Sequence, residues 1–207
     1  LRGNRFAILV RDVDAAACEA ARVRSEELRR RGLPNRFGPQ RFGRDGDNAE
    51  QGRRILRGES SPRDRRAARF LLSALQAEVF NAVLAERVLG IDRVEPGDVA
   101  VVHASGGLFV VEDAAAEAPR AAAFEISPTG PIFGSRAPEA RGVVALRERA
   151  VLVAHGIPQE GLRAPRGVRL RGGRRALRVR PEELVLEPAP EGLRVGVTLP
   201  AGSYASV

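Results

Sequence analysis

The chain lacks lysine, methionine and tryptophan, and it has one cysteine and one tyrosine among its 207 residues. The single Cys18 excludes an internal disulfide bond, which fits a reducing compartment such as the cytoplasm. No run of 18 apolar residues is present, so the sequence predicts no membrane-spanning helix. The apolar stretch after residues 1–6 is short and leads into charges, which is not the pattern of a signal peptide. The absence of methionine leads us to expect a piece of a longer reading frame.

The same shortages exclude several kinds of chemistry. A phosphate-binding loop of the G-x-x-x-x-G-K-[ST] type requires a lysine, and the chain has none. His103 and His155 lie far apart with no cysteine pair beside them, so we expect no metal site. Ser73 and Ser203 have no histidine close in the sequence to support a nucleophilic triad. We therefore expect no zinc site, no phosphate-binding loop of this type and no such triad.

Positive charge is what the chain has in excess. All 34 basic residues are arginine, against 26 acidic residues, which gives a formal net charge of +8. A GC-rich genome explains arginine in place of lysine but not the positive sign, and a basic domain fits a polyanionic partner. Arginines gather over residues 63–69 and again over residues 163–180. A solvated surface is the better interpretation for any single one, whereas the density over 163–180 favours phosphate contacts for the group.

Helices and strands are expected to intersperse without strict βαβ repetition, which predicts an α+β fold. Residues 6–13 read as a strand, and Asp14 can cap a helix over 15–31 that Gly32 ends. An apolar stripe predicts a long buried helix from Pro62 to about residue 89. The other expected elements are helices over 47–57, 113–123 and 138–155, a hairpin of strands 99–102 and 108–111, a loop over 127–134, and strands over 168–170, 176–179, 184–186 and 193–199.

Aromatic residues are sparse, at 4% of the chain, but three of them lie in unusual places. Phe37 and Phe42 lie in a loop rich in glycine and proline. Phe6 begins the first strand beside Asn4 and arginines. An aromatic ring in such a setting can stack on an unpaired base while the amide bonds the base edge. The alternative is that Phe6 is an ordinary core residue.

Several blocks resemble, in order, the motifs of the TruD family of tRNA pseudouridine synthases. Residues 3–6, GNRF, are similar to the family's G-N-x-F element. Residues 32–43, GLPNRFGPQRFG, resemble its G-x-P-N-Y-F-G-x-Q-R-F-G block, with Arg36 where tyrosine is usual. The remaining matches are residues 73–81 (SALQAEVFN), 129–134 (TGPIFG), 173–177 (GRRAL) and 199–205 (LPAGSYA).

The resemblance implies part of a mixed-sheet catalytic core shared by pseudouridine synthases, with a large inserted α/β domain. By motif position, residues 1–31 are a core segment, 32–180 the inserted domain and 181–207 the return to the core. The family isomerises a D-arm uridine of tRNA, uridine-13, to pseudouridine without metal or cofactor. The implied protein is a cytoplasmic monomer whose partner is tRNA.

The resemblance also implies which residues bind. The family's catalytic aspartate lies in a G-x-K-D element upstream of G-N-x-F, so no catalytic residue is expected in this chain, and the chain alone should be inactive. Asn4 and Phe6 would lie in the uridine pocket. The arginine run over residues 163–180 makes Arg174 and Arg175 candidate RNA contacts, and Arg41 is a third candidate. The aspartates of this chain are expected to have ordinary roles as a strand end, a helix cap and a turn residue, at Asp12, Asp14 and Asp45.

Two alternatives stay open beside the enzyme. The chain could be a non-catalytic RNA-binding module, or it could come from an inactive relative that lacks the aspartate. The full reading frame separates these hypotheses, because a G-x-K-D element upstream would favour the enzyme.

Overall fold

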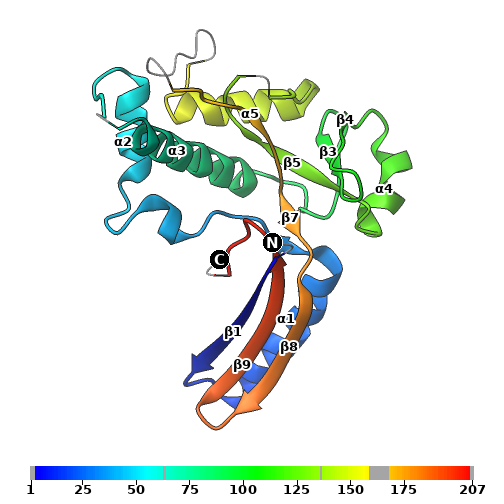
Figure 1. Cartoon of the computed structure of the whole chain (residues 1–207). Coiled ribbons are helices and arrows are strands. Elements are labelled where there is room, and N and C mark those ends of the chain that lie inside the picture. Colours follow the sequence, from blue (N-terminus) through cyan, green and yellow to red (C-terminus); the bar gives the residue numbers. More distant parts are fainter. Residues whose placement is uncertain (1–2, 63, 136, 159–167, 206–207) are drawn as a thin grey trace.

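A computed structural model of the protein describes residues 3–62, 64–135, 137–158 and 168–205. Its helices and strands fall into two parts, one above the other in Figure 1. Except for an isolated parallel bridge between Ser135 and Arg171, every strand pair in the described residues is antiparallel. This arrangement confirms the α+β fold class.

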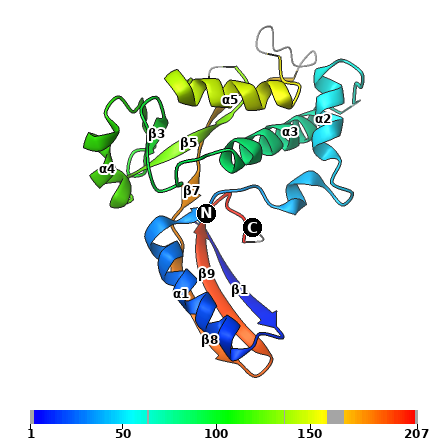
Figure 2. The ribbon, with the colours of Figure 1, turned by 180° about the vertical axis from the view of Figure 1, so that it is seen from behind.

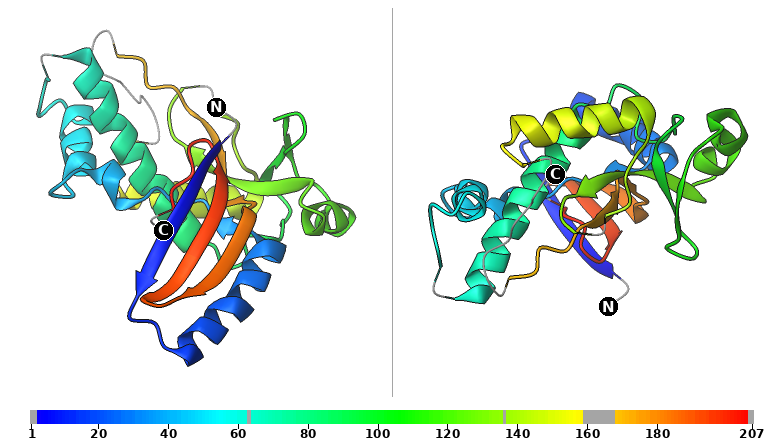
Figure 3. Two further views of the ribbon diagram at one scale, coloured as in Figure 1. Left: turned by 60° about the horizontal axis from the view of Figure 1, so that its bottom comes forward. Right: turned by 90° about the horizontal axis from the view of Figure 1, so that it is seen from above.

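The lower part is a three-stranded sheet with one helix. Its strands are β1 (Gly3–Arg11), β8 (Glu182–Ala189) and β9 (Gly192–Pro200), in the order β1-β9-β8. Helix α1 (Ala15–Arg31) covers one face of this sheet beside β8 and β9 (Figures 2 and 3). Strand β1 thus covers residues 3–11, whereas a strand over residues 6–13 was predicted.

The ends of α1 follow from local chemistry. The side chain of Asp14 accepts a hydrogen bond from the Ala17 amide at 2.7 Å, which satisfies one free N–H of the first turn. Gly32 ends the helix with φ 86°, a conformation that glycine adopts without steric cost. The predicted cap, the predicted stop and both helix bounds are confirmed.

The upper part is built around α3 (Arg65–Ala85), which begins at the cap Asp64 rather than at Pro62. Helices α2 (Asn48–Leu56) and α5 (Gly142–Ala154) lie against α3 (Figure 1). Among the described residues, α3 is long and apolar enough to cross a membrane, but most of its apolar side chains lie in the protein core. The largest cluster there includes Ile55, Leu72, Leu75, Val79, Val83, Phe133 and Val151.

A four-stranded sheet lies beside α3 in the order β4-β3-β5-β6. Strands β3 (Val99–Val102) and β4 (Leu108–Val110) form the predicted hairpin, and α4 (Ala114–Ala122) follows it. The other two strands are β5 (Ile126–Ile132) and β6 (Gly173–Ala176). The remaining short elements are β2 (Leu33–Pro34), the 3-10 helix η1 (Pro39–Phe42) and β7 (Arg178–Val179).

Two predictions for this part were wrong. Residues 127–134 were expected as a loop because of Pro128 and Pro131, but β5 is a buried central strand. A proline removes a donor and keeps its acceptor, and the Pro128 carbonyl accepts from the Leu177 amide at 2.9 Å. Residues 168–170 were expected as a strand, but they form no strand and run along α3, where they cover its core-facing side chains.

The two parts of the molecule are joined where the chain passes between them twice. On the outward passage lies β2 and on the return lies β7, and these two-residue strands pair with each other. The beginning of β1 and the end of β9 reach the same region, so both described chain ends lie there (Figure 1). We call this region the junction, defined by β2, β7 and residues 200–204.

Candidate functional site

The first residues of β1 lie at the junction end of the three-stranded sheet. Gly3 pairs with Pro200, Asn4 with Leu199 and Phe6 with Val197. A Cβ atom on Gly3 would lie 2.6 Å from the Leu199 carbonyl oxygen, so only glycine allows this close strand contact.

Asn4 and Phe6 lie on one face of the sheet, because residues two apart in a strand share a face. That face also carries their buried cross-strand partners Leu199 and Val197. Phe6 is half-buried and Asn4 is exposed, with no side-chain hydrogen bond within the described residues. The half-buried Phe6 ring and the exposed Asn4 amide are groups that can hold an unpaired base. Their role in base binding stays a prediction.

Residues 35–37 are fixed by two asparagines. The Asn35 amide group donates to the Ala176 carbonyl at 2.9 Å, and Asn35 is buried. The side chain of Asn81 accepts from the Phe37 N–H at 2.8 Å and donates to the Phe37 carbonyl at 2.9 Å. The Asn81 side chain thus satisfies backbone groups of Phe37, which belongs to no regular element, and Asn35 joins this segment to the end of β6. Both residues are structural parts of the motif blocks.

The ring of Phe37 is the centre of an aromatic and cationic cluster. Phe80 and Tyr204 meet it edge-on, with ring centroids 5.6 and 5.9 Å away. The guanidinium carbon of Arg175 lies 4.1 Å from the Phe37 ring centroid. Residues from four motif blocks therefore meet at the junction: 32–43, 73–81, 173–177 and 199–205.

Arg175 is bound to protein on several sides. Its guanidinium donates to the Asn35 carbonyl at 3.1 Å, to the Asn35 side chain, and to the Gly202 carbonyl at 3.0 Å. Burial is the main cause that lowers the pKa of Arg175 to about 10, so the group stays charged at neutral pH. Its bonds tie the segment after β9 to the segment before η1.

Arg174 points the other way, since neighbouring strand residues alternate between faces. Its side chain is 1% exposed and forms an ion pair with Glu148, with N–O distances of 2.6 and 2.8 Å. It also donates to the side chain and the carbonyl of Thr129, at 2.9 and 2.8 Å. The geometry of Arg174 and Arg175 favours structural roles over the RNA contacts that the arginine density suggested. We therefore propose structural roles for both.

Arg178 belongs to the arginine run over residues 163–180 that was expected to contact phosphate, yet it is completely buried. It donates to the Ser127 hydroxyl and to the carbonyls of Arg31, Ala121 and Ile126, and its charge lies 3.9 Å from the Phe124 ring centroid. Burial lowers its pKa to about 10. It bridges the carbonyl end of α1 and the elements around α4 and β5. The sequence gives no signal that Arg178 is buried, because arginines in this run occur at both odd and even positions and therefore on both strand faces.

Arg41 lies at the end of η1 with its guanidinium close to two phenylalanine rings. It donates to the Ser73 hydroxyl at 2.7 Å and lies 5.9 Å from the Phe37 and 5.7 Å from the Phe70 ring centroid. It is half-buried, while Phe70 is 46% exposed. An arginine with an exposed ring beside it can meet RNA, and this role of Arg41 stays a prediction.

Comparison with solved structures first defines the kind of fold. The crystal structure of a putative tRNA pseudouridine synthase D from Methanosarcina mazei matches with a TM-score of 0.81 at 20% identity. The match covers 100% of this chain and 67% of that one. The α+β architecture described above is therefore shared with the matched two thirds of that protein.

Sequence comparison then defines the family. The family described as tRNA pseudouridine synthase D (TruD) matches residues 1–62 and 64–207, so the chain belongs to the TruD family. It is 45% identical to the tRNA pseudouridine synthases D of Thermus thermophilus and of an Anaeromyxobacter species, over 211 and 215 residues. All of this chain is covered, against 56% and 60% of those relatives, so it spans somewhat over half their length.

Proposed function

We propose that the full protein containing this chain is a tRNA pseudouridine synthase that isomerises a D-arm uridine, uridine-13, to pseudouridine. The observation that carries the proposal is family membership over the whole chain, with the family's motif blocks meeting at one end of the sheet that holds Asn4 and Phe6. Relatives 45% identical carry the name of that activity.

The reaction breaks the bond between ribose C1′ and uracil N1 and forms a bond between C1′ and C5. The hydrogen on C5 leaves as a proton and N1 gains one, so no oxidant or reductant is required. In this proposal the aspartate that begins the chemistry belongs to a segment upstream of Leu1. This chain contributes the Phe6 ring against the uracil and the Asn4 amide as a hydrogen-bonding group that holds it in position.

The other parts of the proposal follow the family. Residues 1–31 and 181–207 belong to the catalytic core, and residues 32–180 form the inserted domain. The partner is tRNA, and the protein acts as a monomer in the cytoplasm. The net charge of +8 supports a polyanionic partner.

Tritium release from tRNA labelled at C5 of uracil tests the activity, because C5 loses its hydrogen in the reaction. The full protein should release tritium over many turnovers, and the 207-residue chain alone should release none. A full protein that binds tRNA but releases no tritium would favour the inactive relative. Turnover by the 207-residue chain would contradict the placement of the aspartate outside it.

A variant of Phe6 tests the pocket. In the full protein, Phe6→Ala should lower turnover by the loss of one stacking ring, about 1–3 kcal/mol, with a smaller loss of stability. The matched control is Leu9→Ala, which removes a half-buried side chain from the opposite face of β1. If Phe6→Ala only unfolds the protein and leaves the specific activity of the folded fraction unchanged, Phe6 is a core residue.

A further inference from the structure

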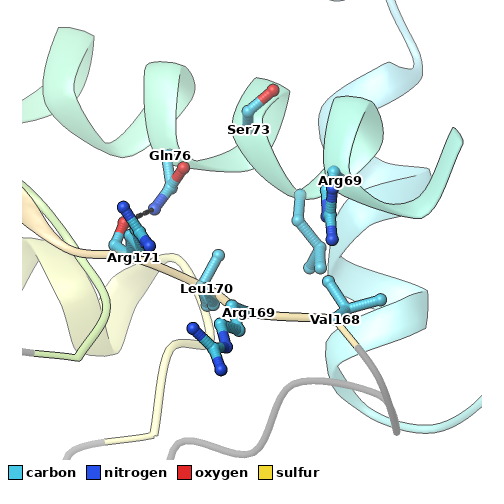
Figure 4. Close-up of a pocket in the computed structure, with 8 residues that line it drawn as sticks. Arg69, Ser73, Gln76, Val168, Arg169, Leu170 and Arg171 are labelled. Atoms are coloured by element: carbon cyan, nitrogen blue, oxygen red, sulfur yellow. Dashed lines mark hydrogen bonds between the residues drawn. The ribbon is translucent and has the colours of Figure 1, made fainter. Parts of the chain in front are cut away.

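A pocket of about 540 Å³ lies between α3 and residues 168–171. Figure 4 shows the two walls, with Arg69, Ser73 and Gln76 on α3 and the extended segment facing them. The residues that line it are Arg69, Leu72, Ser73, Gln76, Val168, Arg169, Leu170 and Arg171. They include three arginines and no carboxylate.

The second wall is residues 168–171, an extended segment whose side chains alternate between the core and the surface. Val168 and Leu170 are buried and pack in the core cluster of α3, while Arg169 and Arg171 are exposed. The buried side chain of Gln76 donates to the Arg171 carbonyl at 3.1 Å and to the Phe133 carbonyl at 2.6 Å. The arginines are therefore presented by backbone that the core and Gln76 hold in place.

The charge of the pocket is not neutralised by its own walls. Within the described residues, Arg69, Arg169 and Arg171 form no ion pair, whereas Arg174 is paired with Glu148. The Arg41 guanidinium adds a fourth positive charge at the wall, because it donates to Ser73. Gathering like charges is unfavourable unless an anion balances them.

We propose that this pocket binds the phosphodiester backbone of the tRNA substrate, at a distance from the uracil site, through Arg69, Arg169 and Arg171. Guanidinium forks pair bidentately with phosphate oxygens. Arg41, which donates to Ser73, lies beside the Phe37 ring, and Tyr204 meets that ring edge-on. Tyr204 follows β9, whose Leu199 pairs with Asn4. In this proposal one RNA molecule contacts both sites. The inference rests on the proposed function for the identity of the RNA.

The test is tRNA binding by the full protein over a range of salt concentrations. Replacing Arg69, Arg169 and Arg171 together by alanine should lower the log–log salt slope by roughly 2–3, at about 0.7–0.9 for each phosphate that is no longer neutralised. The same variant should raise KM for tRNA in the tritium assay and leave kcat at saturating tRNA close to that of the unchanged protein.

Two further variants test whether loss of charge in general, or failure to fold, explains the result. The triple replacement of Arg11, Arg24 and Arg194 by alanine removes equal charge from exposed residues elsewhere, and its slope should stay near that of the unchanged protein. Replacing Arg69, Arg169 and Arg171 by lysine keeps the charge and should keep most of the slope. The lysine variant also gives a readout if the alanine variant does not fold.

The outcomes separate this inference from the proposed function. Tritium release with unchanged slope and KM in the pocket variant would overturn the pocket and leave the function standing. A reduced slope confined to the pocket variant, in a protein that releases no tritium, would support the pocket and overturn the function. An equal reduction of the slope in the two alanine variants, or no tRNA binding by the unchanged protein, would overturn the pocket.

Discussion

Two sets of arginines, close in sequence, lie in opposite surroundings. Arg174, Arg175 and Arg178 are held by protein acceptors, and Arg178 is completely buried. Arg169 and Arg171 are exposed at a pocket that Arg69 also lines. The difference lies in the acceptors within reach, because a buried guanidinium requires partners for its donors whereas an exposed one has water or a ligand. Arginine density alone therefore does not identify an RNA surface.

The largest loss of stability is expected for Arg174→Ala. This change leaves the Glu148 carboxylate buried without its partner, which should lower the free energy of unfolding by about 3–5 kcal/mol. Urea denaturation of the full protein measures it. Replacing both Arg174 and Glu148 by apolar residues should recover part of the stability. A loss of stability well below about 1 kcal/mol for Arg174→Ala would show that Arg174 is not held by protein partners and resembles the exposed Arg169 and Arg171.

Arg178→Ala is expected to cost somewhat less, because no carboxylate is left unpaired. It leaves the carbonyls of Ala121 and Ile126 without this donor in a buried place, which should lower stability by about 2–3 kcal/mol. The matched control is Arg180→Ala, which removes an exposed arginine from the same segment. Equal thermal denaturation midpoints for the two variants would contradict the buried role.

Arg175→Lys is a smaller change that tests the contacts at the junction. Lysine keeps the charge but loses the planar fork on Asn35 and the stacking on Phe37, so stability should fall by roughly 1–2 kcal/mol. A double-mutant cycle with Phe37→Leu checks the coupling. Additive effects of the two changes would show that the ring and the guanidinium do not stabilise each other.

Some of this could be predicted from the sequence and some could not. Local signals were sufficient for α1, because Asp14 and Gly32 determine its ends within the segment itself. The motif blocks indicated the family and the residues Asn4 and Phe6. The central strand β5 was missed because its prolines lose only donors there, and tertiary partners on both sides decide its conformation. The faces of Arg174 and Arg175 also depend on distant partners, Glu148 and Asn35.

The most direct test compares Arg171 with Arg174, which lie in the same segment, by two measurements on each variant of the full protein. Arg171→Ala should change stability by less than about 0.5 kcal/mol and lower the salt slope of tRNA binding by roughly 0.7–0.9. Arg174→Ala should lower stability strongly, and its folded fraction should keep the slope of the unchanged protein. If Arg174→Ala instead lowers the slope without loss of stability, and Arg171→Ala leaves the slope unchanged, the division into buried and open arginines is wrong.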